Sequence, residues 1–179
     1  MTALIIIGVI VALLVLYVIG TYNSLVGLRN KVEDSWAQIE VLLKRRADLI
    51  PNLVETVKGY AKHEEGTLTG VIEARNKALA ATTPEEEMKA AGEVTQALSK
   101  LLALTEAYPD LKANENFMDL QHNLKDTEDK ISFSRQFYND SALKYKDLVQ
   151  MFPSNIIANI FKNLTESILN NPSIKGWAK

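Results

Sequence analysis

The chain has 179 residues, a formal net charge of −2 from 20 basic and 22 acidic side chains, and no cysteine. A chain of this length is expected to form one main domain, and the lack of cysteine excludes a disulfide framework, a Cys-ligated metal and a thiol nucleophile. The balanced charge, with no basic stripe interleaved with aromatic residues, argues against nucleic acid as a partner.

The most apolar part of the chain lies near its N-terminus. Residues 3–17 read ALIIIGVIVALLVLY, and the first charged side chain is that of Arg29. Extended to residues 20 and 21, the apolar window is roughly 18 residues or slightly more, near the lower limit for a helix that crosses a bilayer. We therefore predict a transmembrane anchor over residues 1–21, with the lipid bilayer as its partner.

Two other interpretations of this segment are weaker. A cleaved secretory signal would have a basic start and a small-x-small cleavage site, which the segment lacks. A buried core helix would not be apolar on every face at the end of a small helical domain. Because Arg29 and Lys31 follow the segment and no basic residue precedes it, the flanking charges favour an N-terminus outside and a helical domain in the cytoplasm.

Residues 22–80 carry a heptad-like apolar seam and no strand pattern, which predicts one long helix. Pro51 lies inside it and removes a backbone donor, so we expect a restart or, as the favoured interpretation, a kink at this point. Gly66 and Gly70 weaken the helix locally. The spacing places Arg46 on the seam, where a charged guanidinium needs a carboxylate partner.

Two more long helices are expected after residue 80. Thr83 as N-cap and Pro84 at the first helical position open a helix that runs to about Tyr108. The next helix runs from about Asn114 to Met151, again with apolar residues at alternating spacings of three and four.

A short apolar helix follows Pro153 and completes the prediction. The fold class is therefore all-α, with an N-terminal single transmembrane helix that continues into a long-helix antiparallel four-helix bundle. We assign residues 22–152 to the bundle and residues 153–179 to a C-terminal amphipathic helix and tail.

The predicted helix lengths are unequal. At about 1.5 Å per residue the first helix would be on the order of 90 Å long, against roughly 40 and 55 Å for the next two. The membrane-proximal part of the first helix would then keep an exposed apolar stripe, which predicts an interface in a homo-oligomer. The alternative, that Pro51 lets this part fold back onto its own bundle, stays open. The stripe consists of Leu25, Val32, Trp36 and Ile39.

The C-terminal helix also has two interpretations. It either packs in the core or on a neighbouring subunit, which we favour, or it lies on the membrane surface as an amphipathic helix. The candidate contact residues are Ile156, Ile160, Phe161 and Leu164.

Several charged side chains fall on or beside the helical seams. We predict that they form buried ion pairs that fix the register of the bundle. The functional alternative is that Arg45 and Arg46 bind an acidic lipid head group or partner. The ion-pair candidates are Arg45, Arg46, Arg75, Glu106, Glu128 and Arg135.

No catalytic, cofactor-binding or metal site is predicted. A di-metal bundle site needs Glu-x-x-His pairs on facing helices, and neither His63 nor His122 has a Glu three residues before it. No nucleophile motif and no Gly-rich phosphate loop is found. We therefore do not expect an enzyme or a bound cofactor.

Several segments of the chain closely resemble the LemA family. They include YNSLV at 22–26, LKRR at 43–46, DLIPNLV at 48–54, VKGY at 57–60 and EAYPDLKA at 106–113. The resemblance extends from the anchor to Pro153 and fades beyond it. It implies a bacterial inner-membrane protein with one N-terminal span, the N-terminus outside and a cytoplasmic helical bundle, and it implies no enzymatic activity.

Two functions remain open at this point. The first is a membrane-anchored, non-enzymatic scaffold that forms a homo-oligomer at the bacterial membrane and shapes or organises it. The second is a monomeric, membrane-tethered adaptor that recruits a soluble or membrane protein partner, such as a protein quality-control or signalling component. By analogy, the family includes a magnetosome-associated protein, and its members often accompany membrane protein quality-control genes.

Overall fold

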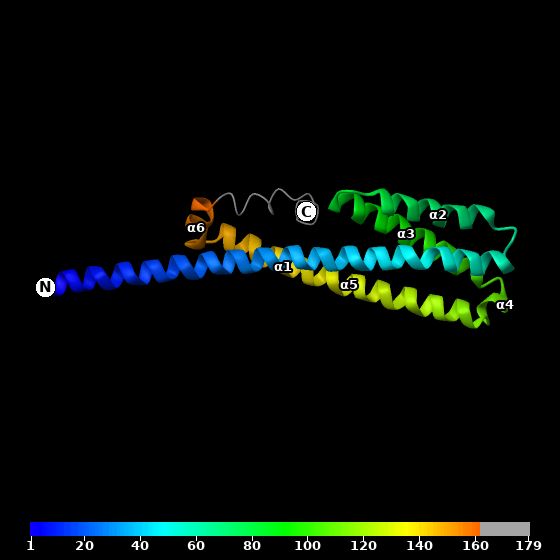
Figure 1. The fold of residues 1–179 in the computed structure, drawn as a ribbon, viewed down its shortest axis with the longest axis horizontal. Coiled ribbons are helices and arrows are strands. Elements are labelled where there is room, and N and C mark those ends of the chain that lie inside the picture. Colours follow the sequence, from blue (N-terminus) through cyan, green and yellow to red (C-terminus); the bar gives the residue numbers. More distant parts are fainter. Residues whose placement is uncertain (162–179) are drawn as a thin grey trace. The chain divides into compact units, whose positions relative to one another are not determined.

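The structure is a computed structural model that describes residues 1–161. Within these residues it has helices and no strand, which confirms the predicted all-α class. The expected contact residue Leu164 and the tail from residue 162 onward lie outside the described residues. The helices are α1 Thr2–Tyr60, α2 Glu65–Ala80, α3 Pro84–Thr105, α4 Pro109–Lys112, α5 Glu115–Gln150 and α6 Ser154–Ile160 (Figure 1).

Helix α1 runs through Pro51 as a continuous helix of 59 residues, and it ends at Tyr60 rather than near residue 80. The prediction of one helix over residues 22–80 was wrong because a turn over residues 61–64 separates α1 from α2. A continuous helix would have left Leu68 and Val71 without packing partners. After the turn, α2 buries both side chains in the core, at 6% and 1% exposure.

The start of α3 agrees with the prediction. The hydroxyl of Thr83 accepts a hydrogen bond from the backbone N–H of Glu86 at 3.3 Å, and the Glu86 carboxylate accepts one from the backbone N–H of Thr83 at 3.3 Å. This capping box satisfies two donors at the first turn, with Pro84 in the position where it loses no helical bond. The helix ends at Thr105, slightly before the expected Tyr108.

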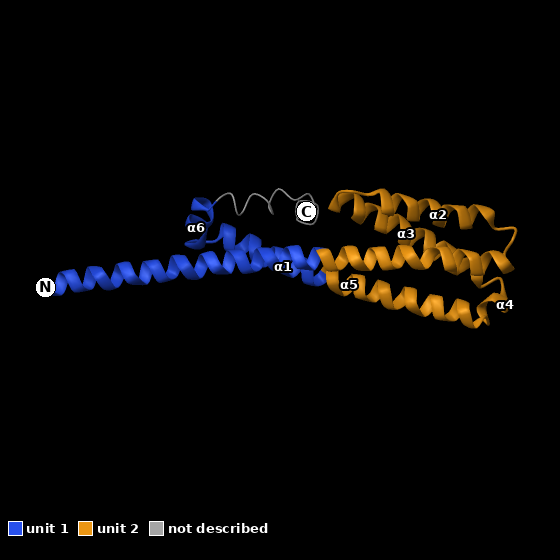
Figure 2. Ribbon diagram, in the orientation of Figure 1, with its two compact units in different colours: residues 1–36, 136–179 blue, residues 37–135 orange. Residues whose placement is uncertain are grey.

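The chain forms two compact units (Figure 2). Unit 2 comprises residues 37–135 and contains parts of α1 and α5 together with α2, α3 and α4. Its core is a contiguous apolar cluster drawn from all of these helices. The largest fully buried members of this cluster are Ile50, Leu53, Leu101, Leu111 and Phe117.

Unit 1 comprises residues 1–36 together with the chain from residue 136 onward. Two aromatic contacts join its helices. The rings of Trp36 and Tyr138 lie 5.5 Å apart, and those of Tyr22 and Phe161 lie 4.8 Å apart. Because the later residue of α1 meets the earlier residue of the returning chain, α5 runs antiparallel to α1 in this unit. The domain boundaries expected at residues 22 and 153 stay a prediction.

The apolar stripe expected to be bare on α1 is buried within this chain. Leu25 and Val32 in unit 1 are 1% and 3% exposed, Ile39 in unit 2 is 1% exposed, and Trp36 is half-buried. In unit 1, the buried α5 side chains of Tyr138 and Tyr145 belong to the same packing. The expectation that the chain's own helices could not reach this stripe was wrong, because the C-terminal half of α5 returns along it.

The N-terminal part of α1 has the opposite character. Every large apolar side chain from Leu4 to Ile19 is exposed, with values between 39% and 72%. Among the described residues, α1 is the one helix long and apolar enough to cross a membrane. Exposed apolar surface on every face of a helix is typical of a segment in contact with lipid. Helix α1 can therefore serve as a membrane anchor.

Candidate functional site

The polar centre of unit 2 is the side chain of Arg46, the largest fully buried side chain among the described residues at 2% exposure. Its Nη1 donates to the carboxylate of Glu128 at 2.6 Å and to the hydroxyl of Thr95 at 2.9 Å. Its Nη2 donates to the backbone carbonyl of Ala91 at 3.0 Å. Arg46 thus joins α1 to α3 and to α5 in one place.

The seam position of Arg46 explains its burial. Helical spacing places it between the apolar residues Leu43 and Ile50, so its side chain enters the space between the helices. A guanidinium cannot release its proton there, and its desolvation is tolerated only with an ionic partner and satisfied donors. Glu128, which lies 82 residues away in the sequence, supplies the carboxylate that the sequence requires.

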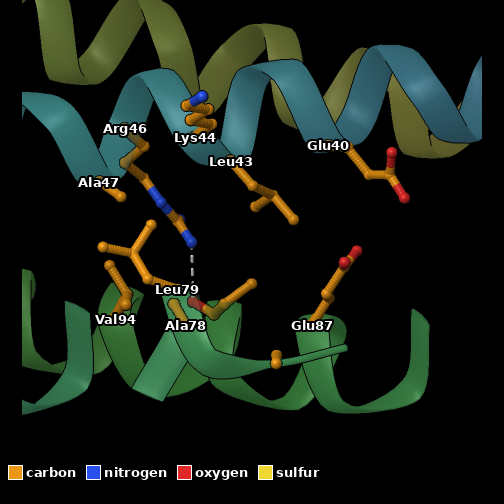
Figure 3. A pocket seen from close by; sticks show the side chains of 11 residues that line it. Glu40, Leu43, Lys44, Arg46, Ala47, Ala78, Leu79, Glu87 and Val94 are labelled. Carbon is orange, nitrogen blue, oxygen red and sulfur yellow. Dashed lines mark hydrogen bonds between the residues drawn. The ribbon is translucent and has the colours of Figure 1, made fainter. Parts of the chain in front are cut away.

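A cavity of about 160 Å³ lies beside Arg46, between α1, the end of α2 and the start of α3 (Figure 3). Its walls are mainly apolar, and the carboxylates of Glu40 and Glu87 point toward each other across it. The cavity is smaller than a typical ligand site, which holds roughly 300–1,000 Å³. This volume does not indicate a substrate pocket.

Glu87 is a functional candidate that the sequence analysis missed. Burial raises the pKa of its carboxyl group above the ordinary value, and the negative charge of Glu40 raises it further. Its Oε2 atom is buried and has no hydrogen-bond partner within the described part of the chain. The first-turn position of Glu87 signalled only a favourable contact with the helix dipole. Only the fold shows that it turns inward.

The structure gathers three of the six ion-pair candidates. Arg46 pairs with Glu128, and Arg135 lies close to both. Burial lowers the pKa of Arg135 most strongly. The negative charge of Glu128 raises this pKa, and the positive charge of Arg46 lowers it. The Nε of Arg135 is buried without a hydrogen-bond partner among the described residues. The site therefore places two guanidinium groups around one carboxylate.

The other candidates lie elsewhere. Arg45 faces Asp126 at 4.0 Å on the surface, with 46% of its side chain exposed. Glu106 pairs with Lys112 at 2.6 Å, also on the surface, so the expected burial of both Arg45 and Glu106 was wrong. Such exposed pairs contribute little to stability because water and salt screen them.

Arg75 is the remaining candidate, and its described contacts are hydrogen bonds to neutral acceptors. Its Nε donates to the carbonyl oxygen of Ala47, and its Nη1 is 3.4 Å from the side-chain oxygen of Asn76. The side chain therefore connects α2 to the backbone of α1. The role expected for it as an ion-pair partner does not fit these contacts.

The two histidines do not form a site in the described structure. His63 lies in the turn between α1 and α2, and His122 lies in α5. Among residues 1–161 there is no group of three or more metal-ligating side chains that could hold an ion.

An apolar groove on unit 2 was also missed by the sequence analysis. It has a volume of about 460 Å³ and lies between α1 and α5, where Val41 and Phe133 are 67% and 70% exposed. Neither Val41 nor Phe133 occupies a position of the apolar seams, so the spacing of apolar residues in the sequence did not reveal the groove. The remaining lining residues are Ala37, Gln38, Leu42, Lys130 and Ser134.

Comparison with protein families shows that residues 35–174 match the LemA family. The match continues past Pro153, where the resemblance of individual segments was expected to fade.

Individual relatives are more distant. The chain is 24% identical to the Magnetosome protein MamQ of Magnetospirillum gryphiswaldense, a similarity that covers 78% of this chain and 61% of the relative. It is 25% identical to Protein LemA of Metamycoplasma hominis over 78% of this chain and 64% of the relative. Magnetosome protein MamQ 2 of Paramagnetospirillum magneticum is 24% identical with the same coverage as the first. The chain spans about three fifths of the length of these relatives.

Proposed function

This chain belongs to the LemA family, and from that premise we propose that it is a membrane-anchored, non-enzymatic helical scaffold that assembles with further copies of itself at a bacterial inner membrane. The observation that carries the proposal is the continuity of α1. One helix supplies both the exposed apolar run that ends near Ile19 and the core residues Ile50 and Val57 of unit 2. The apolar run and part of the core of unit 2 thus belong to one helix of the chain.

The charges that follow the apolar run support an orientation. Arg29 and Lys31 follow the run within the short distance over which basic residues determine topology. The bundle then lies in the cytoplasm and the N-terminus outside. The names of the magnetosome relatives support a place at a bacterial membrane compartment by analogy.

The use of buried polar groups supports a non-enzymatic role. Arg46 donates its hydrogen bonds to Glu128, Thr95 and the carbonyl oxygen of Ala91, and these contacts hold three helices together. The adjacent cavity is small. The names of the relatives, Protein LemA and Magnetosome protein MamQ, state no reaction.

Self-assembly is supported by the groove between α1 and α5 in unit 2. Phe133 and Val41 expose large apolar side chains there, which is unusual for a surface without a partner. Beside the groove, Lys130 pairs with Asp126 at 2.8 Å. A patch with both signs of charge next to apolar residues is self-complementary, because a twofold partner can place each charge opposite its counterpart. We therefore assign the groove to a second copy of the chain.

The test measures the mass of the full chain in mild detergent and images it in native membranes. We expect an oligomer that dissociates toward the monomer in Phe133→Ser. The matched control is Met118→Ser, which removes another exposed apolar side chain of α5, 47% exposed, outside the groove. A parent chain that is a monodisperse monomer would contradict the scaffold and favour the adaptor that recruits a membrane protein partner.

A further inference from the structure

The segment from the end of α5 through α6 has apolar side chains on two faces. Residues 148–161 contain no charged side chain. One face of α6 is part of the core of unit 1, with Ile157 and Ala158 at 4% and 2% exposure. Elsewhere the segment exposes Asn159 and five large apolar side chains, and we call these five side chains its exposed face. They are Met151 at 62%, Phe152 at 80%, Ile156 at 52%, Ile160 at 71% and Phe161 at 37% exposure.

Within unit 1, this face lies next to the end of the apolar run of α1. The ring of Phe161 lies 4.8 Å from the ring of Tyr22. Tyr22 directly follows the part of α1 from Thr2 to Thr21, which at about 1.5 Å per residue has roughly the thickness of a bilayer's hydrocarbon core. Thr21 and Leu25 are also the first buried side chains of α1. Tyr22 and Phe161 therefore lie together at the edge of the hydrocarbon core.

We propose that the exposed face formed by Met151, Phe152, Ile156, Ile160 and Phe161 is a second membrane contact, which inserts into the interfacial layer of the leaflet where the α1 span ends. The inference rests on the proposed anchoring by α1. It gives unit 1 two points of attachment to one leaflet, so that unit 1 is fixed in rotation about the axis of its α1 segment.

The chemistry of the face favours lipid over a protein partner. Aromatic and aliphatic side chains at this depth are typical of the membrane interface, where Tyr and Phe rings meet the acyl chains. A protein partner would have to displace lipid that the adjacent α1 segment already contacts. Because residues 148–161 carry no charge, the contact does not depend on the head-group charge, unlike a polybasic surface.

The absence of cysteine allows a direct depth measurement on the full chain. We compare three single-cysteine variants, each labelled with an environment-sensitive fluorophore and reconstituted in phosphatidylcholine vesicles. Ile156→Cys probes the proposed face, Val18→Cys probes the anchor, and Phe137→Cys is the control. Phe137 is exposed to a similar extent, 47% against 52% for Ile156, so the labels start from comparable surroundings.

Phe137 is a suitable control because it lies in unit 1 away from Tyr22. It adjoins Tyr138, whose ring contacts Trp36. Trp36 follows Tyr22 by fourteen residues on α1, a distance of roughly 21 Å along the helix. That distance exceeds the thickness of one interfacial layer, which is about 5–8 Å. A label at residue 137 should therefore remain in water.

Each label is exposed in turn to a lipid with a quencher near the head group and to aqueous iodide. We expect the lipid to quench the labels at residues 18 and 156 several-fold more than the label at residue 137, and iodide to quench only the last. The same result in vesicles with and without anionic lipid supports the charge-independent contact. Circular dichroism checks that each variant keeps the helical content of the parent.

The other outcomes separate the two proposals. A label at residue 156 that iodide reaches, with residue 18 quenched by lipid, overturns the second contact and leaves the anchor in place. A label at residue 156 that neither quencher reaches indicates a covering protein surface and also overturns it. A label at residue 18 that lipid does not quench contradicts the anchor of the proposed function, and the second contact falls with it.

Discussion

The side chain of Arg75 donates a hydrogen bond from Nε to the carbonyl oxygen of Ala47 at 2.8 Å. Ala47 precedes Pro51 by four residues, so its carbonyl is the one that the backbone of residue 51 would bond in an uninterrupted helix. Proline has no N–H and leaves this carbonyl free. Helix α2 therefore supplies, through Arg75, the donor that Pro51 withdraws from α1.

We predict that Arg75→Met destabilises the protein by about 1–3 kcal/mol, because the carbonyl of Ala47 loses its donor in a partly buried place. Pro51→Ala restores the backbone N–H that can bond the carbonyl of Ala47. Arg75→Met should therefore destabilise the Pro51→Ala variant much less than it destabilises the parent. Thermal unfolding of the two single variants and the double variant measures this coupling. An equal cost of Arg75→Met in both backgrounds would show that Pro51 and Arg75 are independent.

The pair of Arg46 and Glu128 leads to a second prediction. Glu128→Ala leaves the buried guanidinium without its carboxylate and should lower the free energy of unfolding by about 2–4 kcal/mol. We expect a smaller loss than for a fully buried pair because the side chain of Glu128 is 39% exposed. Replacing both partners, as Arg46→Met with Glu128→Leu, should recover most of the loss, since no unpaired charge remains.

The matched control for this pair is Asp126→Asn. Asp126 lies two residues before Glu128 and forms exposed pairs with Arg45 and Lys130, so its replacement should leave the melting temperature unchanged. The role of the ion pair in the register of the bundle is tested by the mass of the stable double variant: a mass that differs from the parent's supports the role, and an unchanged mass contradicts it.

Glu87 provides a pH-dependent prediction. Burial and the charge of Glu40 raise its pKa in the folded state, so the folded protein resists its ionisation more than the unfolded chain does. The parent therefore loses stability as the pH rises from the ordinary value of 4.5 through the raised value. Glu87→Gln should melt at a higher temperature than the parent at pH 7, and the difference should vanish below about pH 4. A difference that does not depend on pH would contradict this assignment.

Leu25 tests whether the stripe on α1 is core. Its side chain is 1% exposed in unit 1, so Leu25→Ala should cost about 2–5 kcal/mol through the cavity that it creates. Leu143→Ala removes the same side chain from a 56% exposed position of α5 in that unit and should change stability by less than about 0.5 kcal/mol. Denaturation and mass measurements are made on both variants. A Leu25 variant of unchanged stability that loses only assembly would restore the interface interpretation.

Some features of the fold were predictable because they depend on residues close together in the sequence. The apolar run before Arg29, the capping box at Thr83 and the helix start at Pro84 each follow from local spacing. The position of Arg46 on the seam required an ionic partner for the same reason. From these local patterns, the helices and the requirement of Arg46 for a carboxylate partner can be predicted before any tertiary contact is known.

Other features depend on which helix faces which. Gly66 and Gly70 did not indicate the turn after Tyr60. The turn is stabilised because it lets the apolar side chains of α2 pack against residues that are distant in the sequence. The stripe at Leu25 and Val32 was assigned to an interface because the predicted helix lengths suggested that no other helix of the chain reaches it. Helix lengths do not show which part of α1 the helix α5 packs against. The groove at Phe133 arises only when two helices are side by side.

The sequence by itself determined that the chain is helical, that its apolar run can anchor it, and that Arg46 must meet a carboxylate. Only the tertiary structure decided that Glu128 is this carboxylate, that Arg75 satisfies the carbonyl freed by Pro51, and that α6 turns an apolar face outward beside Tyr22. The physical reason is the range of the interactions. Helical periodicity and capping act within a few residues, whereas desolvation and hydrogen bonding between helices select partners by packing across the whole chain.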